Sequence, residues 1–393
     1  MRLRVLGGCV AVVTVALMAS TASATDGPLP TTMRALVAKP GADGTPAVEV
    51  VDRPVPVPGP AEVLLRVVAT GTNRAEIMQA AGKVPLPAGA TDIMGLEAAG
   101  VVVALGSDAA SLSTAGGAPP AIGLRAIAIV TGGGQAEFVC VPVTALVPVP
   151  AGLPLEVAAA LPEQWTTAYQ LLFEVGGLDV AGGDETVVVY AAGSGVGTAA
   201  LQLLRMTGRR SVAVAGRADK LAKAAELGAA VTVNYKEDAA WADTVAAAVP
   251  GGAHLVLDCV GGSFFESTAK LLRTDGVWVL YGLLGGPSAP GPALGMLLRK
   301  RIQLRATTLR ARSDAYKAGL AAGLAANVMP RIAAPSAAAT SVSATGDAAP
   351  AGSAPLRPVI EDTLDGLDAV AEAFARMRRS ENLGKYVIRV AAE

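Results

Sequence analysis

The sequence predicts an α/β protein in which a β-rich first part precedes a doubly wound parallel sheet. Short apolar runs punctuated by Gly and Pro fill the chain up to about residue 156, which is typical of a small β-barrel or sandwich. From about residue 158, apolar runs alternate with segments of helical spacing, which is the pattern of a parallel sheet. The apolar runs of this second part are rich in Val and Leu, as expected for strands covered on both faces.

Composition excludes several classes of function. The chain has 393 residues, of which 52% are hydrophobic and 17% charged, so two domains with a large core are expected. A net charge of -1 offers no basic surface, so neither nucleic acid nor a membrane is a predicted partner. Cys9, Cys140 and Cys259 are far apart, and His254 is the only histidine. This set predicts no metal site and no disulfide framework.

The first 32 residues are set apart from the fold. Arg2 and Arg4 precede the apolar stretch Val5–Met18, and Ala22–Ala24 has the small residues of a cleavage site, as in a secretory or organelle-entry signal. The alternative is an upstream extension, with the working chain starting at Met33. The first interpretation predicts a secretory or organellar location, and the second a cytoplasmic one.

The Gly and Pro residues of the first part delimit its expected strands, helix and loop. Pro56–Pro60 is a Pro/Gly turn between two expected strands, and residues 107–121 form an expected exposed loop. Helical spacing predicts a short helix at 73–82. The expected strands of this part are 48–55, 62–69, 98–105, 125–130 and 136–143.

The second part opens with an expected helix at 161–175 and then predicts six strands. The expected strands are 186–191, 211–215, 231–234, 254–260, 277–281 and 302–308, and the helices between them are 196–207, 218–227, 239–248 and 264–272. The low-complexity segment 333–355 is expected to be a disordered loop. A strand at 356–360, a helix at 365–378 and a strand at 384–390 follow, and this tail is expected to return to the first part.

A glycine-rich turn, Ala191–Gly197, joins the first strand of this series to its helix. Glycines in such a turn let the backbone approach a phosphate group closely, and the helix N-terminus offers free N–H groups and a partial positive charge. In this strand–turn–helix setting, the turn predicts a site for the diphosphate of a dinucleotide. A tight turn with a structural role only is the alternative.

The residues after the second strand favour NADPH over NADH. Enzymes that use NAD generally place an acidic residue there, which accepts hydrogen bonds from the adenosine ribose. Here Gly216 leaves space for a 2′-phosphate, and Arg217 and Lys220 supply positive charge for it. The alternative is that both side chains are solvated surface charges. Asp219 falls at the start of the next expected helix, where it can serve the helix N-terminus.

Nine segments of the chain match the motifs of one family. They are TNRAEIMQAAGK (72–83), IMGLEAAGVV (93–102), GGGQAEFV (132–139), LPEQWTTAYQLL (161–172), AAGSGVGTAALQL (191–203), ELGAAVTVNYKE (226–237), LVLDCVGG (255–262), WVLYGLLGG (278–286) and NLGKYV (382–387). On these segments the chain resembles the zeta-crystallin-like quinone oxidoreductases, a zinc-free branch of the medium-chain dehydrogenase/reductase superfamily. Within that family it looks most like the tumour-suppressor-inducible subgroup.

The resemblance implies a fold and an assembly. A GroES-like β-barrel catalytic domain is expected at 33–156, a Rossmann NADPH-binding domain at 157–312, and a return to the catalytic domain at 313–393. The active site would lie in the cleft between the two domains. A homodimer, or a homotetramer built as a pair of dimers, is expected to form through edge strands of the cofactor domains.

The resemblance also implies roles for single residues. Asn73 is the implied catalytic residue, because it stands where zinc-dependent relatives place a catalytic cysteine, and its amide would contact the nicotinamide ribose or the substrate. Thr167 would touch the nicotinamide, and Lys385 would reach the cofactor from the other domain. The remaining cofactor contacts would be Ser194, Gly195, Val196 and Gly197 at the diphosphate, Gly216, Lys220 and Tyr235 at the 2′-phosphate, and Gly282 and Leu283 in the nicotinamide pocket.

Three positions depart from the family pattern. Val84 stands where the family often has a Tyr that lines the substrate pocket, which affects the shape of that pocket and any Tyr-assisted catalysis. Arg217 stands where Ser or Thr is frequent, and this change is expected to keep the phosphate preference. Gly123–Leu124 replaces a Gly-Asp pair, which is an expected loop difference.

The predicted reaction is zinc-independent hydride transfer from NADPH to a quinone or another conjugated carbonyl compound, since quinones accept electrons without a metal Lewis acid. No convincing protein acid is found. His254 is interpreted as structural, Glu97 is left open between an orienting or ion-paired residue and a proton donor, and the proton is expected from solvent or a ribose hydroxyl. Two alternatives remain: an NADPH-dependent alkenal or enone reductase, and a non-catalytic NADPH-binding protein.

Overall fold

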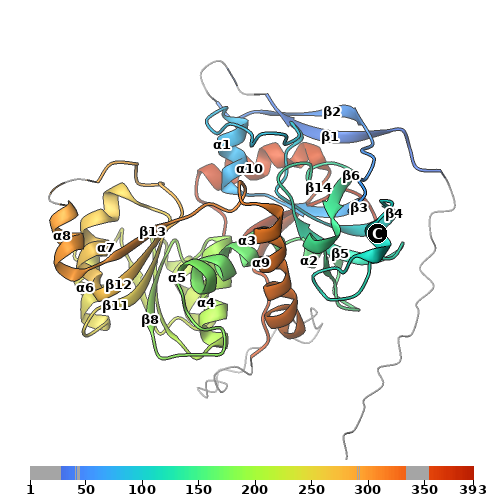
Figure 1. The fold of residues 1–393 in the computed structure, drawn as a ribbon. Helices are drawn as coiled ribbons and strands as arrows, with labels where there is room; N and C mark the ends of the chain where they lie inside the picture. The colour runs from blue at the N-terminus through green and yellow to red at the C-terminus, as the bar shows by residue number, and fades with distance from the viewer. Residues whose placement is uncertain (1–27, 40, 42–44, 290, 292, 333–353) are drawn as a thin grey trace, which may run out of the picture.

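The computed structural model describes residues 28–39, 41, 45–289, 291, 293–332 and 354–393. The signal-like segment 1–24 and nearly all of the low-complexity segment 333–355 lie outside the described residues. Figure 1 shows a parallel sheet with its helices on the left and a barrel-like sheet on the right, with helices α3 and α9 between them. The protein is therefore an α/β protein with a doubly wound sheet and a second, β-rich unit, as the sequence predicts.

The six-stranded sheet has the strand order β10-β9-β8-β11-β12-β13, and all of its neighbouring strands run parallel. The order reverses between β8 and β11, so a crevice for ligands is expected at the carboxyl ends of these two strands. The six strands confirm the predicted series. They are β8 (Thr186–Tyr190), β9 (Arg210–Ala215), β10 (Val231–Asn234), β11 (Ala253–Asp258), β12 (Leu272–Leu280) and β13 (Gln303–Ala306).

Both faces of this sheet are covered. In β8, Val187 and Val189 pack into one hydrophobic cluster with residues of α4, while Val188 and Tyr190 pack into another with residues of α7. This double burial explains why the strand is apolar throughout. The helices of this unit are α4 (Gly195–Met206), α5 (Ala218–Glu226), α6 (Trp241–Ala248), α7 (Phe265–Leu271) and α8 (Ala293–Lys300).

The β-rich unit contains a seven-stranded sheet and a separate antiparallel pair. The sheet has the order β14-β15-β3-β4-β5-β7, with β6 also paired to β3, and β1 pairs with β2. The strands are β1 (Thr32–Ala38), β2 (Val48–Pro54), β3 (Glu62–Gly71), β4 (Glu97–Leu105), β5 (Arg125–Ile129), β6 (Phe138–Pro142), β7 (Val147–Pro148), β14 (Ile360–Asp365) and β15 (Lys385–Arg389). The helices are α1 (Arg74–Ala80), α2 (Leu155–Ala158) and α10 (Val370–Arg378).

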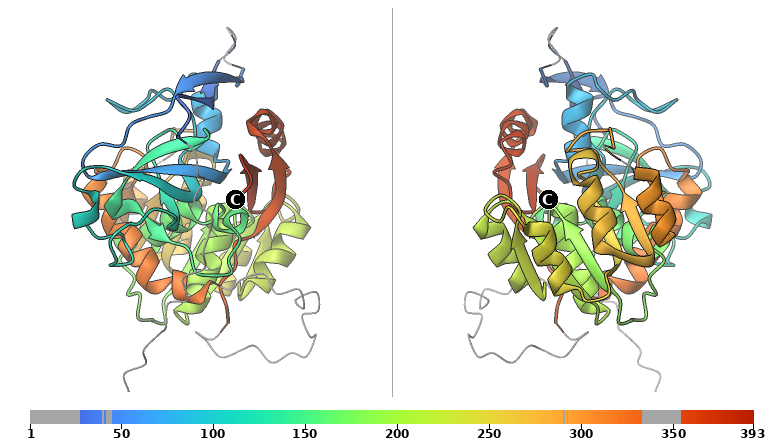
Figure 2. Two further views of the ribbon diagram at one scale, coloured as in Figure 1. Left: turned by 90° about the vertical axis from the view of Figure 1, so that its right-hand side faces the viewer. Right: turned by 90° about the vertical axis from the view of Figure 1, so that its left-hand side faces the viewer.

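The tail returns to the β-rich unit, as predicted, because β15 pairs antiparallel with β3. Figure 2 shows β14, β15 and α10 beside the strands of the first part. The strand predicted at 356–360 is wrong: β14 starts at Ile360, and Leu356 makes only a single bridge to Ile332. Pro358 explains the difference, because it has no N–H group for a ladder. The helix predicted from 365 begins only after Gly366, whose φ is 80°.

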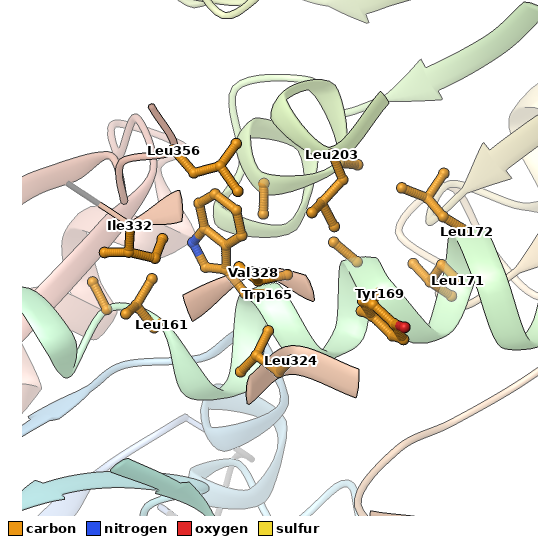
Figure 3. Packing of buried hydrophobic residues seen from close by; sticks show 14 of the residues in the cluster. Leu161, Trp165, Tyr169, Leu171, Leu172, Leu203, Leu324, Val328, Ile332 and Leu356 are labelled. Carbon is orange, nitrogen blue, oxygen red and sulfur yellow. The ribbon is translucent and has the colours of Figure 1, made fainter. Parts of the chain in front are cut away.

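Helix α3 (Pro162–Tyr169), which continues as a π-helical turn at Gln170–Val175, is anchored between the two units. Figure 3 shows Trp165 enclosed by residues of α3, α4, the tail and α9 (Asp314–Asn327), which the sequence patterns do not predict. The Trp165 side chain is fully buried. Glu163 and Thr167, four residues apart and therefore on one face of the helix, are only partly buried. The packing of Trp165 thus fixes the orientation of the Glu163–Thr167 face.

Candidate active site

The glycine-rich turn follows β8 and opens α4, a helix of 12 residues. Ser194 Oγ accepts a hydrogen bond from the Gly197 N–H at 3.1 Å. A Cβ atom on Gly197 would lie 2.6 Å from the Ala191 carbonyl oxygen, so only glycine lets the helix start this close to the strand. Within the described residues, the Val196 N–H group has no protein acceptor, while the Gly195 N–H faces the Gly384 carbonyl oxygen in the bridge between Ser194 and Gly384. The turn therefore fits an anion such as a diphosphate.

A group of cations surrounds the loop after β9. Arg217 forms an ion pair with Asp219 at 2.5 Å and donates to the carbonyl oxygens of Ser380 and Glu381 at 3.2 Å. Asp219 lies in the first turn of α5, as expected, and its carboxylate is also the partner of Arg217.

Lys236 is a member of this group that sequence reasoning missed. A Cβ atom on Gly216 would lie 2.9 Å from the Lys236 Cδ, so the lysine stem covers the glycine. Lys236 follows β10, and the parallel pairing of β10 with β9 brings it there. Lys236 lies inside the family-matching segment 226–237, and this match could have indicated its role. Lys220 Nζ donates to the Ser380 carbonyl oxygen at 2.8 Å.

On the opposite wall, Asn73 belongs to a buried polar network. Its Oδ1 accepts a hydrogen bond from Lys385 Nζ at 2.6 Å, and its Nδ2 donates to Glu97 Oε1 at 2.8 Å and to Glu76 Oε1 at 3.2 Å. Lys385 also forms an ion pair with Glu97, and both side chains are almost completely buried. Both amide N–H groups of Asn73 are thus engaged, and its side chain also forms a capping box with Glu76 at the start of α1. Glu97 is therefore an ion-paired, orienting residue.

Two further carboxyl groups stand beside this pair. Glu76 is buried and accepts hydrogen bonds from the Leu96 N–H and from Gln135 Nε2, each at 3.0 Å. Burial raises the pKa of Glu76 to about 7, although the charge of Lys385 acts against the shift. Burial also raises the pKa of Glu163 to about 8, and the negative charge of Glu97 adds to the shift. Both groups therefore hold a proton over part of the neutral pH range.

The start of α3 is tied directly to the network. The Glu163 N–H donates to Glu97 Oε2 at 2.8 Å, which brings the face with Glu163 and Thr167 beside Asn73. The glycine-rich turn meets the same unit at another point, because the Gly384 N–H donates to the Gly193 carbonyl oxygen at 2.9 Å. The structure thus gathers Asn73, Lys385 and the backbone of Glu163 around Glu97, beside the turn.

The other predicted residues lie at the carboxyl ends of the strands. Leu283 follows β12 and is 53% exposed, and a Cβ atom on Gly261, after β11, would lie 2.9 Å from its Cδ2. Tyr235 follows β10, and its ring makes an edge contact with Phe264 at 5.3 Å between centroids. Gly282 lies beside Cys259, since its Cβ would be 2.9 Å from the Cys259 carbonyl oxygen.

Arg74 is a second residue that sequence reasoning missed. Its guanidinium group donates to the Met377 carbonyl oxygen at 2.9 Å and keeps its other N–H groups free of protein acceptors within the described residues. Burial lowers the pKa of Arg74, and the Cys259 thiol acts in the opposite direction. Burial also lowers the pKa of Lys220, and the charges of Arg217 and Arg74 act in the same direction. Arg74, on α1 of the β-rich unit, therefore interacts electrostatically with Cys259, after β11, and with Lys220.

Two cavities lie on the β-rich unit, away from the glycine-rich turn. One of about 560 Å³ is lined by Thr131 and Lys317 among other residues, and it contains none of the predicted site residues. Val84, the departure from the family pattern, lines another of about 350 Å³ together with Gln79 and Leu86.

His254 Nδ1 accepts a hydrogen bond from the Thr186 N–H at 3.0 Å, which ties β11 to β8 and agrees with a structural role.

The described residues hold neither a metal-binding cluster nor a membrane-spanning helix. They contain no cluster of three His, Cys, Asp or Glu side chains arranged to hold a metal ion. None of the described helices has the length and apolar character needed to cross a membrane.

Comparison with known proteins identifies the class. Residues 195–324 match the family described as zinc-binding dehydrogenase, and residues 59–151 match the alcohol dehydrogenase GroES-like domain. Human synaptic vesicle membrane protein VAT-1 homolog-like is 32% identical over 250 residues, which cover 64% of this chain and 56% of that protein. Prostaglandin reductase-3 from Bos taurus is 31% identical over 239 residues, which cover 61% of this chain and 60% of that protein. The match thus spans less than two thirds of the length of these relatives.

Among solved structures, the quinone oxidoreductase from Thermus thermophilus, known also in complex with NADPH, is 30% identical. The alignment covers 91% of this chain and 100% of that chain, with a TM-score of 0.68. The fold and the matches define a medium-chain dehydrogenase/reductase, a superfamily of oxidoreductases. Within it, the chain belongs to the zinc-free family of quinone-oxidoreductase-like proteins. The tumour-suppressor-inducible subgroup stays a prediction.

Proposed function

We propose that the protein is an NADPH-dependent oxidoreductase that reduces quinones without zinc. The observation that carries this proposal is the glycine-rich turn at the start of α4, whose Val196 N–H group has no protein acceptor in the described part of the chain, beside a buried network centred on Asn73. The NADPH complex of the Thermus relative supports the choice of cofactor. Reduction of an alkenal or enone is the second candidate, favoured by the similarity to prostaglandin reductase-3.

The chain's own residues divide the work of holding the nucleotide. Ser194, Gly195, Val196 and Gly197 present the start of α4 to the diphosphate, and Arg74 faces it from the other unit. The amide of Asn73 would contact a ribose hydroxyl or the substrate. Thr167, Gly282 and Leu283 border the nicotinamide, and Lys385 holds Asn73 in place. When bound, the reduced nicotinamide supplies the hydride.

The 2′-phosphate is assigned to the cations around Gly216. Lys236 covers this glycine, and within the described residues its ammonium group has no partner. Arg217 would release Asp219 and bind the phosphate instead. Lys220 and Tyr235 would lie on the other sides of the phosphate. A guanidinium and two ammonium groups so close together favour a doubly charged phosphate over a hydroxyl.

Arg217→Glu is expected to weaken NADPH binding at least about tenfold, because it places negative charge beside the phosphate. NADH, which has no 2′-phosphate, is expected to change by less than about threefold. Fluorescence titration of both nucleotides measures the two dissociation constants. Lys223→Glu, on the same helix and paired with Glu226, is the matched control. Equal losses for NADPH and NADH would show that the 2′-phosphate lies elsewhere.

Turnover of the purified protein on ortho-quinones and on alkenals tests the acceptor class. We expect NADPH consumption with quinones to exceed that with alkenals at equal acceptor concentration. Faster consumption with alkenals would make the second candidate the function. Nucleotide binding without consumption of NADPH with either acceptor would leave the non-catalytic NADPH-binding protein.

Self-association is proposed through the outer edge of the parallel sheet. Leu294 and Leu298, one turn apart on α8, are 81% and 78% exposed, and Leu304 on the edge strand β13 is 42% exposed. An apolar face beside an unpaired strand edge favours a symmetric contact between two copies. The contact gives a homodimer, or a homotetramer if two dimers join.

Leu294→Asp combined with Leu298→Asp is expected to convert the assembly into monomers, because each buried carboxylate would lack a partner. Size-exclusion chromatography with light scattering measures the mass. Val57→Asp, at a side chain that is 88% exposed on the other unit, is the control and is expected to keep the assembly. An unchanged mass of the double variant would rule out this surface.

A further inference from the structure

Glu163 differs from the two neighbouring carboxyl groups in its lack of partners. Glu76 and Glu97 each accept several hydrogen bonds from protein groups. In contrast, no described residue donates a hydrogen bond to the Glu163 carboxyl group, and only its backbone N–H is engaged. The residue is partly exposed, which leaves it open to contact by a small molecule. Of these three carboxyl groups, that of Glu163 is therefore the one without a hydrogen-bond donor among the described residues.

The position of Glu163 is fixed by its helix. Trp165 is fully buried on the opposite side of α3, and the Glu163 N–H is held by Glu97 Oε2 at 2.8 Å. Glu97 also holds the amide of Asn73, so one carboxylate positions both residues. Thr167 lies one helical turn further on the same face. Glu163 thus shares Glu97 with Asn73 and lies on the same face of α3 as the residue assigned to the nicotinamide.

Five charged groups, two negative and three positive, influence the pKa of Glu163. Burial is the largest influence on its pKa and raises it to about 8. Negative charge favours the proton further, and positive charge opposes it. The groups concerned are Glu97 on β4, Glu76 on α1, Lys385 on β15, Lys317 on α9 and Arg310 in the preceding loop. Because burial outweighs the cations, the carboxyl group holds a proton at neutral pH and can donate it.

We propose that Glu163 is the proton donor of the reaction, a catalytic residue that sequence reasoning did not find. The proposal rests on the proposed function and applies to both acceptor classes. Hydride addition delivers two electrons and one hydrogen, and leaves a hydroquinone monoanion from a quinone or an enolate from an enone. The O–H bond of Glu163 then breaks as the proton bonds to that anion, which gives the neutral product. The resulting carboxylate takes a new proton from water in the crevice.

Glu163→Gln removes the proton and keeps the shape of the side chain. We expect turnover to fall by about 100-fold with whichever acceptor the wild type reduces. The dissociation constant of NADPH is expected to stay within about twofold, because Glu163 is not assigned to the nucleotide. Glu174→Gln, at an exposed carboxyl group in the turn that continues α3, is the matched control and is expected to keep wild-type turnover. Wild-type turnover in the Glu163→Gln variant would overturn the proposal.

The pH dependence gives a second readout. The protonated form is the active one, so the turnover of the wild type is expected to fall as the pH rises through about 8. The profile of Glu163→Gln is expected to be flat in that range. Infrared difference spectroscopy of the protein without any acceptor follows the carbonyl band of a protonated carboxyl group. This band is expected to disappear through the same pH range in the wild type, and the component lost near pH 8 is expected to be absent from Glu163→Gln.

The outcomes separate this proposal from the proposed function. An identical infrared titration in the wild type and Glu163→Gln, or identical pH profiles, would overturn the role of Glu163 while the activity stands. A wild-type protein that consumes NADPH with neither acceptor would overturn both.

Discussion

Lys385→Met is expected to destabilise the protein by about 3–5 kcal/mol and to abolish turnover, which is the largest single effect that the structure predicts. Lys385 is 3% exposed in its side chain, and its ion pair with Glu97 is buried between β15 and β3. Removal of the ammonium group leaves the Glu97 carboxylate without a counter-charge and the Asn73 Oδ1 without its donor. A buried charge without a partner costs far more than a lost surface contact.

Urea unfolding followed by circular dichroism measures the loss of stability in Lys385→Met. Lys236→Met, which removes an exposed lysine of the same size, is the control and is expected to change stability by less than about 0.5 kcal/mol. Combining Lys385→Met with Glu97→Gln is expected to recover part of the loss, because the unpaired charge is then also removed. An additive loss in the double variant would contradict the buried ion pair as the source of the effect.

Gly197→Ala is expected to weaken NADPH and NADH binding alike, by at least about tenfold, and to cost about 1–3 kcal/mol of stability. The added Cβ would lie 2.6 Å from the Ala191 carbonyl oxygen and 2.8 Å from the Ala192 Cα. Both are backbone atoms, which cannot move without shifting β8 or α4. The start of the helix would move away from the strand, and the N–H groups of Gly195 and Val196 would lose their positions.

Nucleotide titration and thermal unfolding together measure the effect of Gly197→Ala. Gly319→Ala is the matched control, because no atom lies within 4 Å of its Cβ position in the helix α9. This variant is expected to bind both nucleotides normally and to gain about 0.5–1 kcal/mol of stability from helix propensity. Normal nucleotide binding by Gly197→Ala would show that the turn has only a structural role.

Local patterns were sufficient to predict most of the fold. The central strands of the parallel sheet were predicted because double burial makes them apolar, as in Thr186–Tyr190. The Ala-rich helix α9 was missed because its apolar residues do not form a clear stripe. The strand placed at 356–360 was wrong because Pro358 has no N–H group and interrupts the segment.

The candidate site was predicted only where a local motif marks it. The turn at Ser194–Gly197 has such a motif, and the resemblance added Asn73 and Lys385. The contact between these two residues depends on the pairing of β15 with β3, across more than three hundred residues, and no local pattern reports it. Lys236 and Glu163 were missed for the same reason, since their neighbours come from other strands. That the Glu163 carboxyl group lacks a hydrogen-bond donor can be recognised only from the three-dimensional contacts of Glu76, Glu97 and Glu163.

A crystal structure of the protein with bound NADPH tests the central claim most directly. We expect the diphosphate within hydrogen-bond distance of the Gly195 and Val196 N–H groups, the 2′-phosphate beside Lys236 and Arg217, and the nicotinamide between Thr167 and Asn73. A nucleotide bound anywhere else, or a metal ion coordinated beside Asn73, would contradict it.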